Sequence, residues 1–557
     1  MTPLYVETSR KPLRIVLVTP ALVPKWLAVF VAEARASASV ELEVVVLEQT
    51  SPEQRIRVPW DLGMFLGIER LLTGMLGRLA GRRPGGLLSE VRMDGECGAT
   101  RCADAASLPT AVQASAPDLV LLHGPAALAG SLGSAARHGC WVLDPELTDP
   151  RFAGLSLLLP ILEGNQATGL GLLLATGPGG AGPRELATSW GATSAMSFSQ
   201  QRDIAFAKLP ALLLRALRGL AEVPAATRGN VGILRISPSS FVLRSGMGLR
   251  SMAVAMGQFL RWRGRRLRAR LPWFLVLPTG APVDPSAPVL GEYLGLVAPG
   301  SDYWADPYPV QVDGRRLVFV EELVHAMNKG IIVCLELLPD GSVRRLGEVL
   351  DEEAHLSYPQ VFRREGVWYM TVESCEARRV SLYVAEEFPL RWRRVSDLIE
   401  GREAVDPTLH QQDGCWYLFA NISESGGGLS DELFLFVADT LAGPYRPHPA
   451  NPIVCDARTS RPAGRLFVHE GRLVRPAQCC VPIYGSAVVF NEVLELSPGS
   501  YRERPMATLG PEGIPGLDGC HTYNAWGDFE ALDAHGRPPA MRSRMRVSGP
   551  ENTGATR

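Results

Sequence analysis

Two Asp-Pro dipeptides are the residues of this 557-residue sequence whose type and spacing point most directly to chemistry. Asp306 and Asp406 each open a segment with the same template: a proline, an apolar residue, an acid-glycine turn and an apolar run. Two carboxylates that converge on one site act as acid and as base or nucleophile when a glycosidic bond is cleaved or transferred. Asp306 and Asp406 are therefore candidate catalytic residues, and Glu373, in the run YMTVES, is a third candidate acid. The alternative is that each Asp-Pro only caps a turn by accepting hydrogen bonds from backbone amides.

Other polar residues open further copies of the template. Copies begin at Tyr358, at Arg461 and, in weaker form, at His521, and His355 lies just before Tyr358. If the copies surround one axis, these four side chains meet the two aspartates at a single mouth, where a binding site is expected. They are candidate substrate-binding residues. Aromatic residues near the same positions would either stack on sugar rings or pack between copies.

The template recurs often enough to predict a repeat fold from about Ser301 to Asp533. Its turn glycines are Gly314, Gly366, Gly414 and Gly471, at separations of 366 − 314 = 52, 414 − 366 = 48 and 471 − 414 = 57 residues. Acid-glycine pairs supply the positive φ that a tight hairpin requires, and three to four strands per repeat form one propeller blade. With the copy at His521, we predict an all-β five-bladed propeller. The alternative is a β-sandwich built from unrelated hairpins.

The N-terminal region predicts a different architecture. Apolar runs at Leu13–Thr19, Glu41–Glu48, Asp118–His123 and Cys140–Leu143 are typical of buried strands. Helical patterns at Lys25–Ala36 and Ala126–His138 separate them, and Ala211–Ala221 adds a last helix. Strands that alternate with helices predict an α/β domain with a parallel sheet.

Composition narrows the class of protein. The formal net charge of −2 gives no electrostatic reason to expect nucleic acid as a partner. The ten cysteines form no zinc-binding spacing, so we predict reduced thiols, no metal site and no cofactor. The first apolar run is too short for a signal peptide, and polar residues interrupt the most apolar stretch, Leu155–Leu174. We expect a cytoplasmic protein.

A basic run, Arg261–Leu271, lies between the two predicted domains and has six arginines in eleven positions. It predicts an anion-binding strip for a diphosphate, a sugar nucleotide or an acidic lipid surface, carried by Arg265, Arg266 and Arg268. The alternative is a solvated helix face. The predicted domains are residues 1–225 (α/β), 226–300 (a linker with the basic helix and the first propeller segments), 301–535 (propeller) and 536–557 (a disordered tail).

The segment from Pro117 to Leu174, with PDLVLLHGPAALAGSLGSAARHGCWVLD and FAGLSLLLPILEGNQATGLGLLL, resembles the folate-dependent formyltransferases. That family carries an Asn, a His and an Asp for catalysis. Where its His-containing segment would follow Val142, this sequence reads LDPELTD, so no such set maps here and the resemblance implies the fold without the activity. Asp144 and Asp149 are nearby carboxylates that also suit turn positions.

The repeats resemble the N-terminal domain of the glucosamine inositolphosphorylceramide transferase family, through HLSYPQVF, YMTVES, VDPTL, LAGPYRPHPANPI, SRPAGRLF and RLVRPAQ. They are also similar to the five-bladed arabinanase and invertase hydrolases, whose blades open with Asn-Asp-Pro and Arg-Asp-Pro. The matching pieces here are Ala305-Asp306-Pro307 and Val405-Asp406-Pro407. Arg461 opens the fourth copy where those hydrolases carry an acid in a later blade. The resemblance makes Arg461, Arg475 and Gln478 candidate binders of phosphate or a sugar carboxylate.

Three hypotheses follow. The first is a glycosyl transferase or glycosidase-like enzyme in glycan or glycolipid assembly. The second is a non-catalytic module that binds a glycan or nucleotide sugar, and the third is an amino-sugar formyltransferase. The expected partner is a carbohydrate or sugar-nucleotide substrate, with peripheral contact to acidic lipid as a further option.

Overall fold

The computed structural model describes most of the chain and places it in two compact units. The first unit is formed by residues 1–6, 264–423 and 428–557, and the second by residues 7–263 and 424–427. The described residues are 1–6, 11–47, 59–79, 87–93, 100–102, 105–149, 153–176, 183–194, 197–221, 231–236, 247–266, 273–300, 303–514 and 516–536. Among them, no helix combines the length and the apolarity that crossing a bilayer requires.

The second unit is an α/β domain built on one eight-stranded sheet, in the order β5-β3-β1-β6-β7-β10-β8-β9. Neighbours from β5 to β10 pair in parallel, whereas β8 runs antiparallel to both β10 and β9. The predicted parallel sheet is therefore confirmed. Its strands are β1 Leu13–Pro20, β3 Val40–Leu47, β5 Thr100–Cys102, β6 Leu119–Leu122, β7 Cys140–Leu143, β8 Ala167–Thr176, β9 Arg184–Ala192 and β10 Val231–Ile236.

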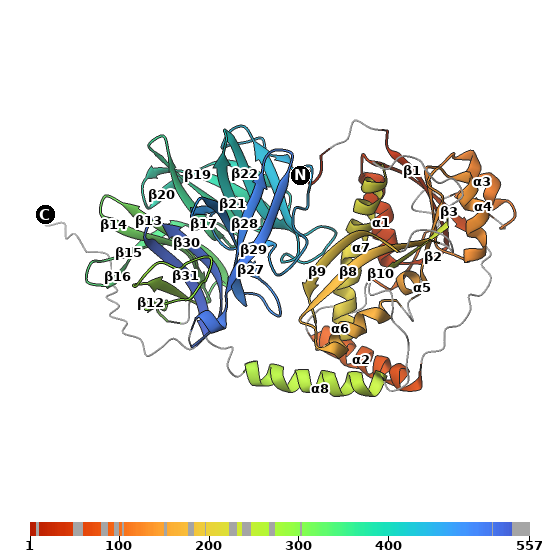
Figure 1. Ribbon diagram of the computed structural model, residues 1–557, viewed down its shortest axis with the longest axis horizontal. Coiled ribbons are helices and arrows are strands. Elements are labelled where there is room, and N and C mark those ends of the chain that lie inside the picture. Colours follow the sequence, from red (N-terminus) through yellow and green to blue (C-terminus); the bar gives the residue numbers. More distant parts are fainter. Residues whose placement is uncertain are drawn as a thin grey trace. The chain divides into compact units, whose positions relative to one another are not determined.

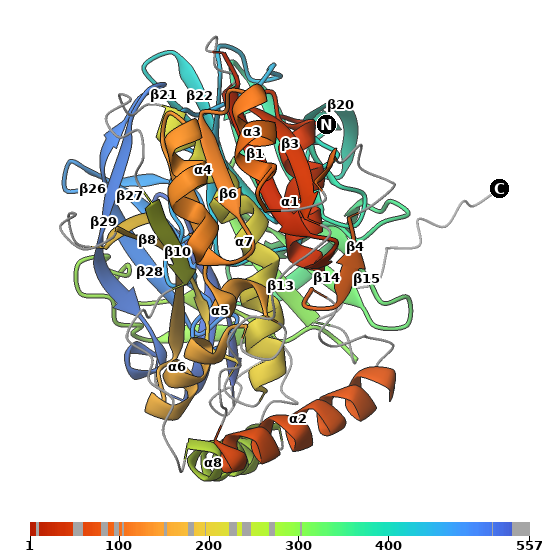
Figure 2. The same ribbon diagram turned by 90° about the vertical axis from the view of Figure 1, so that its right-hand side faces the viewer.

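Both faces of this sheet are covered, because alternate side chains of each strand point to opposite faces. Ile15 and Leu17 of β1 join one core with helices α1 (Lys25–Ala36) and α7 (Phe198–Ala221). Val16 and Val18 join a second core with α3 (Leu108–Ala114) and α4 (Ala129–Ala135), and Figure 2 shows these two helices in front of the sheet. The remaining elements are β2 Leu22–Pro24, β4 Glu90–Arg92, α2 Trp60–Leu79, α5 Pro145–Thr148, α6 Leu158–Glu163 and α8 Met247–Arg266.

The first unit is a propeller in which the described residues form five antiparallel sheets. The inner strands lie near the middle of this unit in Figure 1, and outer strands such as β16 and β20 lie at its rim. Blade 1 is formed by β13 Tyr303–Val312, β14 Arg315–Val324, β15 Lys329–Leu337 and β16 Val343–Leu350. Blade 2 is formed by β17 Ser357–Arg364, β18 Val367–Ser374, β19 Arg379–Glu387 and β20 Arg391–Glu400. Blade 3 is formed by β21 Ala404–Gln412, β22 Cys415–Ile422, β23 Leu433–Ala438 and β24 Arg446–Pro447. Blade 4 is β25 Arg461–Pro462, β26 Phe467–His469, β27 Arg472–Cys479, β28 Ala487–Leu496 and β29 Tyr501–Leu509.

The fifth blade joins distant parts of the chain. Its strands pair in the order β12-β11-β31-β30, where β30 is Leu517–Trp526 and β31 is Phe529–Gly536. The outer strands β11 (Phe274–Pro278) and β12 (Tyr293–Leu296) come before the first blade in sequence. The ring is therefore closed by strands from both ends of the propeller, which removes an exposed sheet edge.

The acid-glycine turns explain why the repeats form hairpins. Asp313, Glu365, Asp413 and Glu470 have φ values of 49°, 50°, 51° and 48°, and the glycine after each also has a positive φ, from 76° to 84°. Positive φ at both central residues is the type I′ turn, whose twist matches that of the two strands it joins. The five-bladed prediction is confirmed.

Candidate active site in the propeller channel

The inner strands of the first three blades share one local distortion. Strand pairing shifts register between Ala305 and Tyr308 in blade 1, and the same shift recurs in blades 2 and 3. The residue before the proline has a left-handed backbone in each: φ is 50° at Asp306, 51° at Tyr358 and 52° at Asp406. Such a bulge redirects a side chain, and a non-glycine residue held at positive φ in a strand often marks a functional site.

A second set of polar residues lies on the next strand of every blade. Each follows its turn glycine by seven residues, or by six in the fifth blade, and the set is Glu321, Glu373, Asn421, Gln478 and Asp533. In blades 1 to 3 its members pair with the residue just before the distortion of the inner strand, as in Ser357 with Glu373. In blade 4, Gln478 pairs with Arg461, the first residue of β25. Sequence reasoning found only Glu373 and Gln478. The constant spacing from the turn glycine would have revealed the others.

Asp406 is held by three residues, all of which the sequence singled out. Its Oδ2 accepts hydrogen bonds from Arg461 Nε at 2.5 Å and from Gln478 Nε2 at 2.7 Å. Its backbone N–H donates to Glu373 Oε2, while Glu373 Oε1 accepts from Ser357 Oγ at 2.7 Å. Both oxygens of Glu373 are thus engaged, whereas Asp406 Oδ1 has no hydrogen bond within the described residues. The structure therefore brings Asp406, Glu373, Arg461 and Gln478 together.

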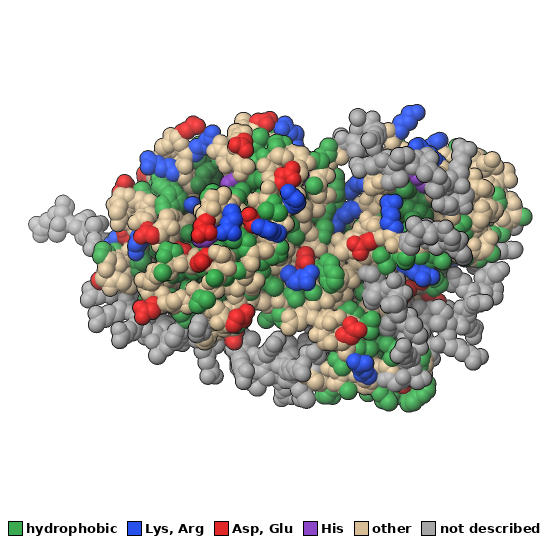
Figure 3. Space-filling model, viewed as in Figure 1, with side chains coloured by type: hydrophobic (Ala, Val, Ile, Leu, Met, Phe, Trp, Pro, Cys, Tyr) green, Lys and Arg blue, Asp and Glu red, His purple; other side chains and the backbone are tan. Residues whose placement is uncertain are grey.

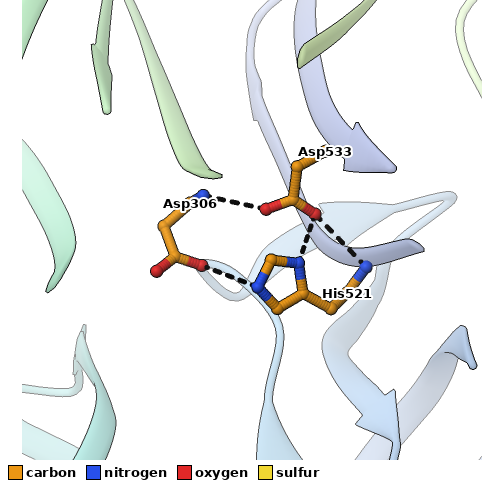
Figure 4. A group of neighbouring side chains, drawn as sticks. All are labelled: Asp306, His521 and Asp533. Atoms are coloured by element: carbon orange, nitrogen blue, oxygen red, sulfur yellow. Dashed lines mark hydrogen bonds and ion pairs between the residues drawn. The ribbon is translucent and has the colours of Figure 1, made fainter. Parts of the chain in front are cut away.

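Asp306 lies beside His521, as Figure 4 shows. Asp306 Oδ1 accepts from Thr522 Oγ1 at 2.8 Å and is 3.5 Å from His521 Nε2. Asp533 Oδ1 lies 2.5 Å from His521 Nδ1, and Asp533 Oδ2 accepts from the Asp306 backbone N–H at 2.8 Å. Asp533, which the sequence analysis did not select, therefore holds both blade-opening residues. Asp306 Oδ2, like Asp406 Oδ1, makes no hydrogen bond to any described residue.

His355 and Tyr358 are placed differently. His355 Nε2 is 3.1 Å from Glu321 Oε1, and its Nδ1 accepts from the Gly330 backbone N–H at 3.0 Å. An acceptor at Nδ1 requires the proton on Nε2, so these contacts fix the tautomer. Tyr358 is buried, and its hydroxyl lies 3.1 Å from Thr408 Oγ1. His355 is half-exposed and accessible to a ligand.

Arg475 is buried among protein groups. Its guanidinium donates to both oxygens of Glu503, at 2.6 and 2.7 Å, and to the backbone oxygens of Thr459 and Ser460. These two residues directly precede Arg461, so Arg475 fixes the segment that carries Arg461. These contacts favour a positioning role over the predicted direct contact with substrate.

The channel contains more acidic side chains than cationic ones. Five carboxyl groups interact there, those of Asp306, Glu321, Glu373, Asp406 and Asp533, together with the cations Arg461 and His521. Burial raises the pKa of Asp306 well above its usual range, His521 opposes this, and the neighbouring carboxylates reinforce it. Burial also raises the pKa of Asp406, and Arg461 opposes that rise. Each carboxylate of the cluster therefore disfavours the ionisation of its neighbours.

Aromatic side chains border this cluster. The Trp273 ring centroid lies 4.1 Å from that of His521, and the Arg461 guanidinium lies 4.8 Å from the Tyr484 ring centroid. Tyr484 is 41% exposed. By contrast, Trp304 and Tyr523 are fully buried in the blades, so these two rings pack within the fold rather than stack on a sugar. Charged and histidine side chains also lie together near the middle of the propeller face in Figure 3.

A hollow on the channel is lined by residues of all five blades. It encloses about 180 Å³, open solvent included, and its lining comprises Asp306, Tyr308, Tyr358, Pro359, Gln360, Thr408, Gly464, Arg465 and Asn524. The lining therefore brings polar side chains of several blades to one place on the channel.

One group in the channel has the donor set for a cation. Ligand atoms of Asp306, His521 and Asp533 all lie within 4.8 Å of one another. Ligation would require neutral His521. Although burial alone lowers it, the pKa of His521 is raised to about 9, chiefly by the Asp533 carboxylate beside it. The donor set therefore fits an internal ion pair better than a metal.

The structure gives less support for a functional role of the candidate residues outside the propeller blades. Arg265 and Arg266 lie in α8, whose side chains are not described there, and Arg268 lies outside the described residues. Asp144 caps α5, since its Oδ1 accepts from the Glu146 backbone N–H at 2.9 Å, and its Oδ2 is 3.0 Å from Arg235 Nε. Asp144 therefore has a structural role.

A partly buried histidine lies at the ends of two parallel strands in the α/β unit. His123 follows β6, and its Nδ1 lies 3.0 Å from Oγ1 of Thr19 in β1. Burial lowers the pKa of His123 to about 4. The imidazole is therefore neutral at physiological pH.

Residues 287–513 match a family model described as glucosamine inositolphosphorylceramide transferase 1, N-terminal. The protein of that name from Oryza sativa subsp. japonica is 37% identical over 216 residues, which are 38% of this chain and 29% of the relative. The Arabidopsis thaliana protein is 32% identical over 208 residues, or 36% and 27% of the two chains. The resemblance of the propeller repeats to this family is confirmed. The chain spans less than a third of the length of these relatives.

Among solved structures, Zg3597, a family 117 glycoside hydrolase from Zobellia galactanivorans, aligns with 48% of this chain and 90% of its own. Its sequence identity is 12% and its TM-score is 0.31. A score this low carries no argument about function. The five-bladed assignment rests on the strand pairing described above.

Proposed function

We propose that the propeller channel cleaves or transfers a glycosidic bond, with Asp406 as the ionised carboxylate and Asp306 as the proton donor. One observation carries this proposal. The two aspartates stand on the same left-handed bulge in alternate blades, only Asp406 accepts hydrogen bonds from an arginine and a glutamine, and each leaves one oxygen without a hydrogen bond in the described residues. Paired carboxyl groups with different proton affinities are what glycosidic chemistry requires.

Asp406 suits the role of base or nucleophile. Hydrogen bonds from Arg461 and Gln478 favour the charged form of the carboxylate, because both donors are aimed at the same oxygen. Arg461 is buried with it, the two side chains being 12% and 3% exposed. The second oxygen of Asp406 remains for the substrate.

Asp306 suits the role of acid. Its carboxyl group is buried and surrounded by the charges of Glu321, Asp406 and Asp533, which disfavour a further negative charge. Glu373, by contrast, uses both oxygens to hold Ser357 and the backbone of Asp406. We infer that Glu373 positions Asp406 and that Asp306 supplies the proton.

The substrate class is inferred from the relatives. The transferases that match this chain act, by their name, on an inositolphosphorylceramide and a glucosamine group. A sugar-bearing lipid or a glycan is therefore the proposed substrate, and Trp273 and Tyr484 offer ring faces on which a sugar would stack.

The test begins with a thermal-shift screen of sugars, glycolipids and sugar nucleotides. A ligand at one hundred times its dissociation constant stabilises the fold by about 2.7 kcal/mol. Turnover of the compounds that bind is then measured for the wild type and for Asp306→Asn, Asp406→Asn and Asp413→Asn. The last variant is a matched control, because Asp413 lies in a turn of blade 3 where Asn tolerates the positive φ.

We expect the two channel variants to lose about a hundredfold to ten-thousandfold in rate and the control to lose nothing. A channel variant that folds normally and keeps full activity would overturn the proposal. Binding without turnover in the wild type, retained when both aspartates are replaced, would instead identify a glycan-binding module.

For the α/β unit we propose the formyltransferase-like fold without the activity. Asp144, at the position nearest to the family's catalytic segment, already bonds Glu146 and Arg235. Calorimetry with a formyl-tetrahydrofolate analogue should therefore give no binding heat. Measurable saturable binding would contradict this view.

A further inference from the structure

Helix α2 exposes an apolar face. Trp60, Met64, Ile68 and Leu71 follow one another at intervals of four, four and three residues and are 74%, 39%, 39% and 70% exposed. This spacing places them on one side of the helix. The opposite side buries Leu62, Phe65 and Leu66 in the core of the α/β unit.

The charged side chains described on α2 point away from this face. Asp61 is buried and accepts from the Gly248 backbone N–H at 2.9 Å. Glu69 accepts hydrogen bonds from Ser197 and Ser199. The described part of the exposed face is therefore apolar, which is unusual for a helix surrounded by water.

The N-terminal end of α8 extends this surface. A Cβ at Gly248 would lie 2.1 Å from the Asp61 backbone oxygen, so a residue without a side chain is needed for the two helices to meet. Leu249 and Met256 of α8 are also exposed, and both helices lie at the foot of the unit in Figures 1 and 2. Hydrophobic side chains gather at the same place in Figure 3.

The sequence of α8 is basic beyond its exposed N-terminal half. Arg261 and Arg263 follow in the same helix, within the run RWRGRR, which contains no acidic residue. An apolar helix face next to a cluster of arginines is the composition of helices that lie in the interface of an anionic bilayer. A protein partner with a compact apolar site would not need the arginine cluster.

We propose that α2 and the N-terminal half of α8 form a membrane-docking surface that adsorbs to anionic lipid. The apolar side chains enter the headgroup boundary, and the arginines of α8 attract the acidic headgroups. This adsorption does not depend on the chemistry of the propeller channel. If the channel acts on lipid-borne sugars, docking would raise the local concentration of substrate.

Vesicle flotation tests the proposal with the full chain. The wild type is mixed with phosphatidylcholine vesicles that either contain or lack phosphatidylserine. The apolar variant is Met64→Gln, Ile68→Gln and Leu71→Gln combined, because glutamine keeps a good helix propensity. Its matched control is Leu22→Gln with Ile204→Gln, two exposed apolar residues elsewhere in the same unit. A third variant, Arg261→Gln with Arg263→Gln, tests the charge.

We expect the wild type and the matched control to float with phosphatidylserine vesicles. The apolar variant should lose at least about tenfold in its partition coefficient, because three apolar side chains no longer leave water. The arginine variant should lose affinity mainly at low salt, where exposed charges attract most strongly. Circular dichroism confirms that each variant folds.

Two results would overturn the proposal. One is wild-type protein that stays with the buffer for both vesicle types. The other is a wild type that sediments as a dimer while the apolar variant sediments as a monomer, with equal lipid binding by both. That outcome would show that the face joins two copies of the chain.

Discussion

Two histidines, one in each unit, have pKa values shifted in opposite directions. His123 in the α/β unit lies beside a threonine hydroxyl, and burial lowers its pKa to about 4. His521 in the propeller lies between two carboxylates, which outweigh burial and raise its pKa to about 9. Burial alone therefore does not set the charge, because the charge of the partner decides it.

The same contrast applies to the acids. In the α/β unit, Asp144 caps a helix and pairs with an arginine at the surface. In the propeller, Asp306 and Asp406 are buried together and retain oxygens without hydrogen bonds in the described residues. A fold tolerates such a cluster only when other contacts fix it in place, and such clusters are typical of functional sites.

The largest expected effect is on the buried pair of Arg461 and Asp406. Arg461→Leu leaves the Asp406 charge buried without its cation, so we expect the propeller to lose about 3–5 kcal/mol of unfolding free energy. Arg458→Leu is the control, because its pair with Asp456 is largely exposed and should contribute at most about 1 kcal/mol. Denaturant unfolding, monitored by hydrogen exchange, measures the loss of unfolding free energy in both variants. Equal losses would show that burial of the first pair carries no special cost.

The next effect is the alkaline loss of His521 stabilisation. Its folded pKa of about 9 lies above the ordinary value of 6.5, so the protonated form stabilises the fold. This stabilisation is complete below about pH 6.5 and is lost as the pH rises through 9, with a size on the order of 3 kcal/mol. The protection factors of β30 and β31, which are exchange rates corrected for intrinsic base catalysis, should therefore fall at high pH in the wild type. This fall should be absent in His521→Gln, and an equal fall in that variant would contradict the assignment.

His123 should show the opposite sign. Because its folded pKa of about 4 lies below 6.5, the neutral form stabilises the α/β unit, and acid removes that stabilisation. Between neutral pH and about pH 5 the loss should be about 2 kcal/mol. Protection factors of β1 and β6, corrected for the intrinsic exchange rate, measure this loss, and His123→Gln is the variant in which it should disappear. Protection factors that fall at high pH instead of in acid would contradict the predicted sign.

The smallest expected effect is at Asp144. Asp144→Ala removes a helix cap and should cost the α/β unit about 1 kcal/mol, without changing turnover or ligand binding in the propeller. Thermal unfolding and the glycan assay measure the two quantities. A loss of turnover as large as that expected for Asp406→Asn would place this acid in the functional machinery and remove the contrast between the regions.

The sequence was a good guide where local chemistry determines the backbone. The acid-glycine turns, the buried strand at Leu13–Thr19 and helix Lys25–Ala36 all appear in the structure because each depends on neighbouring residues. The directions in which side chains near Asp306 point were harder to predict from the sequence. The bulge there interrupts the alternation of faces, so Trp304 turns to the core while Asp306 reaches the channel. The partners of Asp306 on β30 and β31 were missed in part because they lie more than two hundred residues away.

Ring closure by both ends of the propeller also sets an order of assembly during synthesis. Among the propeller strands, β11 and β12 leave the ribosome first. Strand β30 begins 517 − 296 = 221 residues after β12 ends. At roughly 5–20 residues per second, this interval is on the order of 10 to 45 seconds. During it, β11 lacks its partner β31, and Asp306 lacks His521 and Asp533. The acid cluster is therefore the last part of the propeller to form, and a nascent chain that stops before Leu517 has four blades but no complete site.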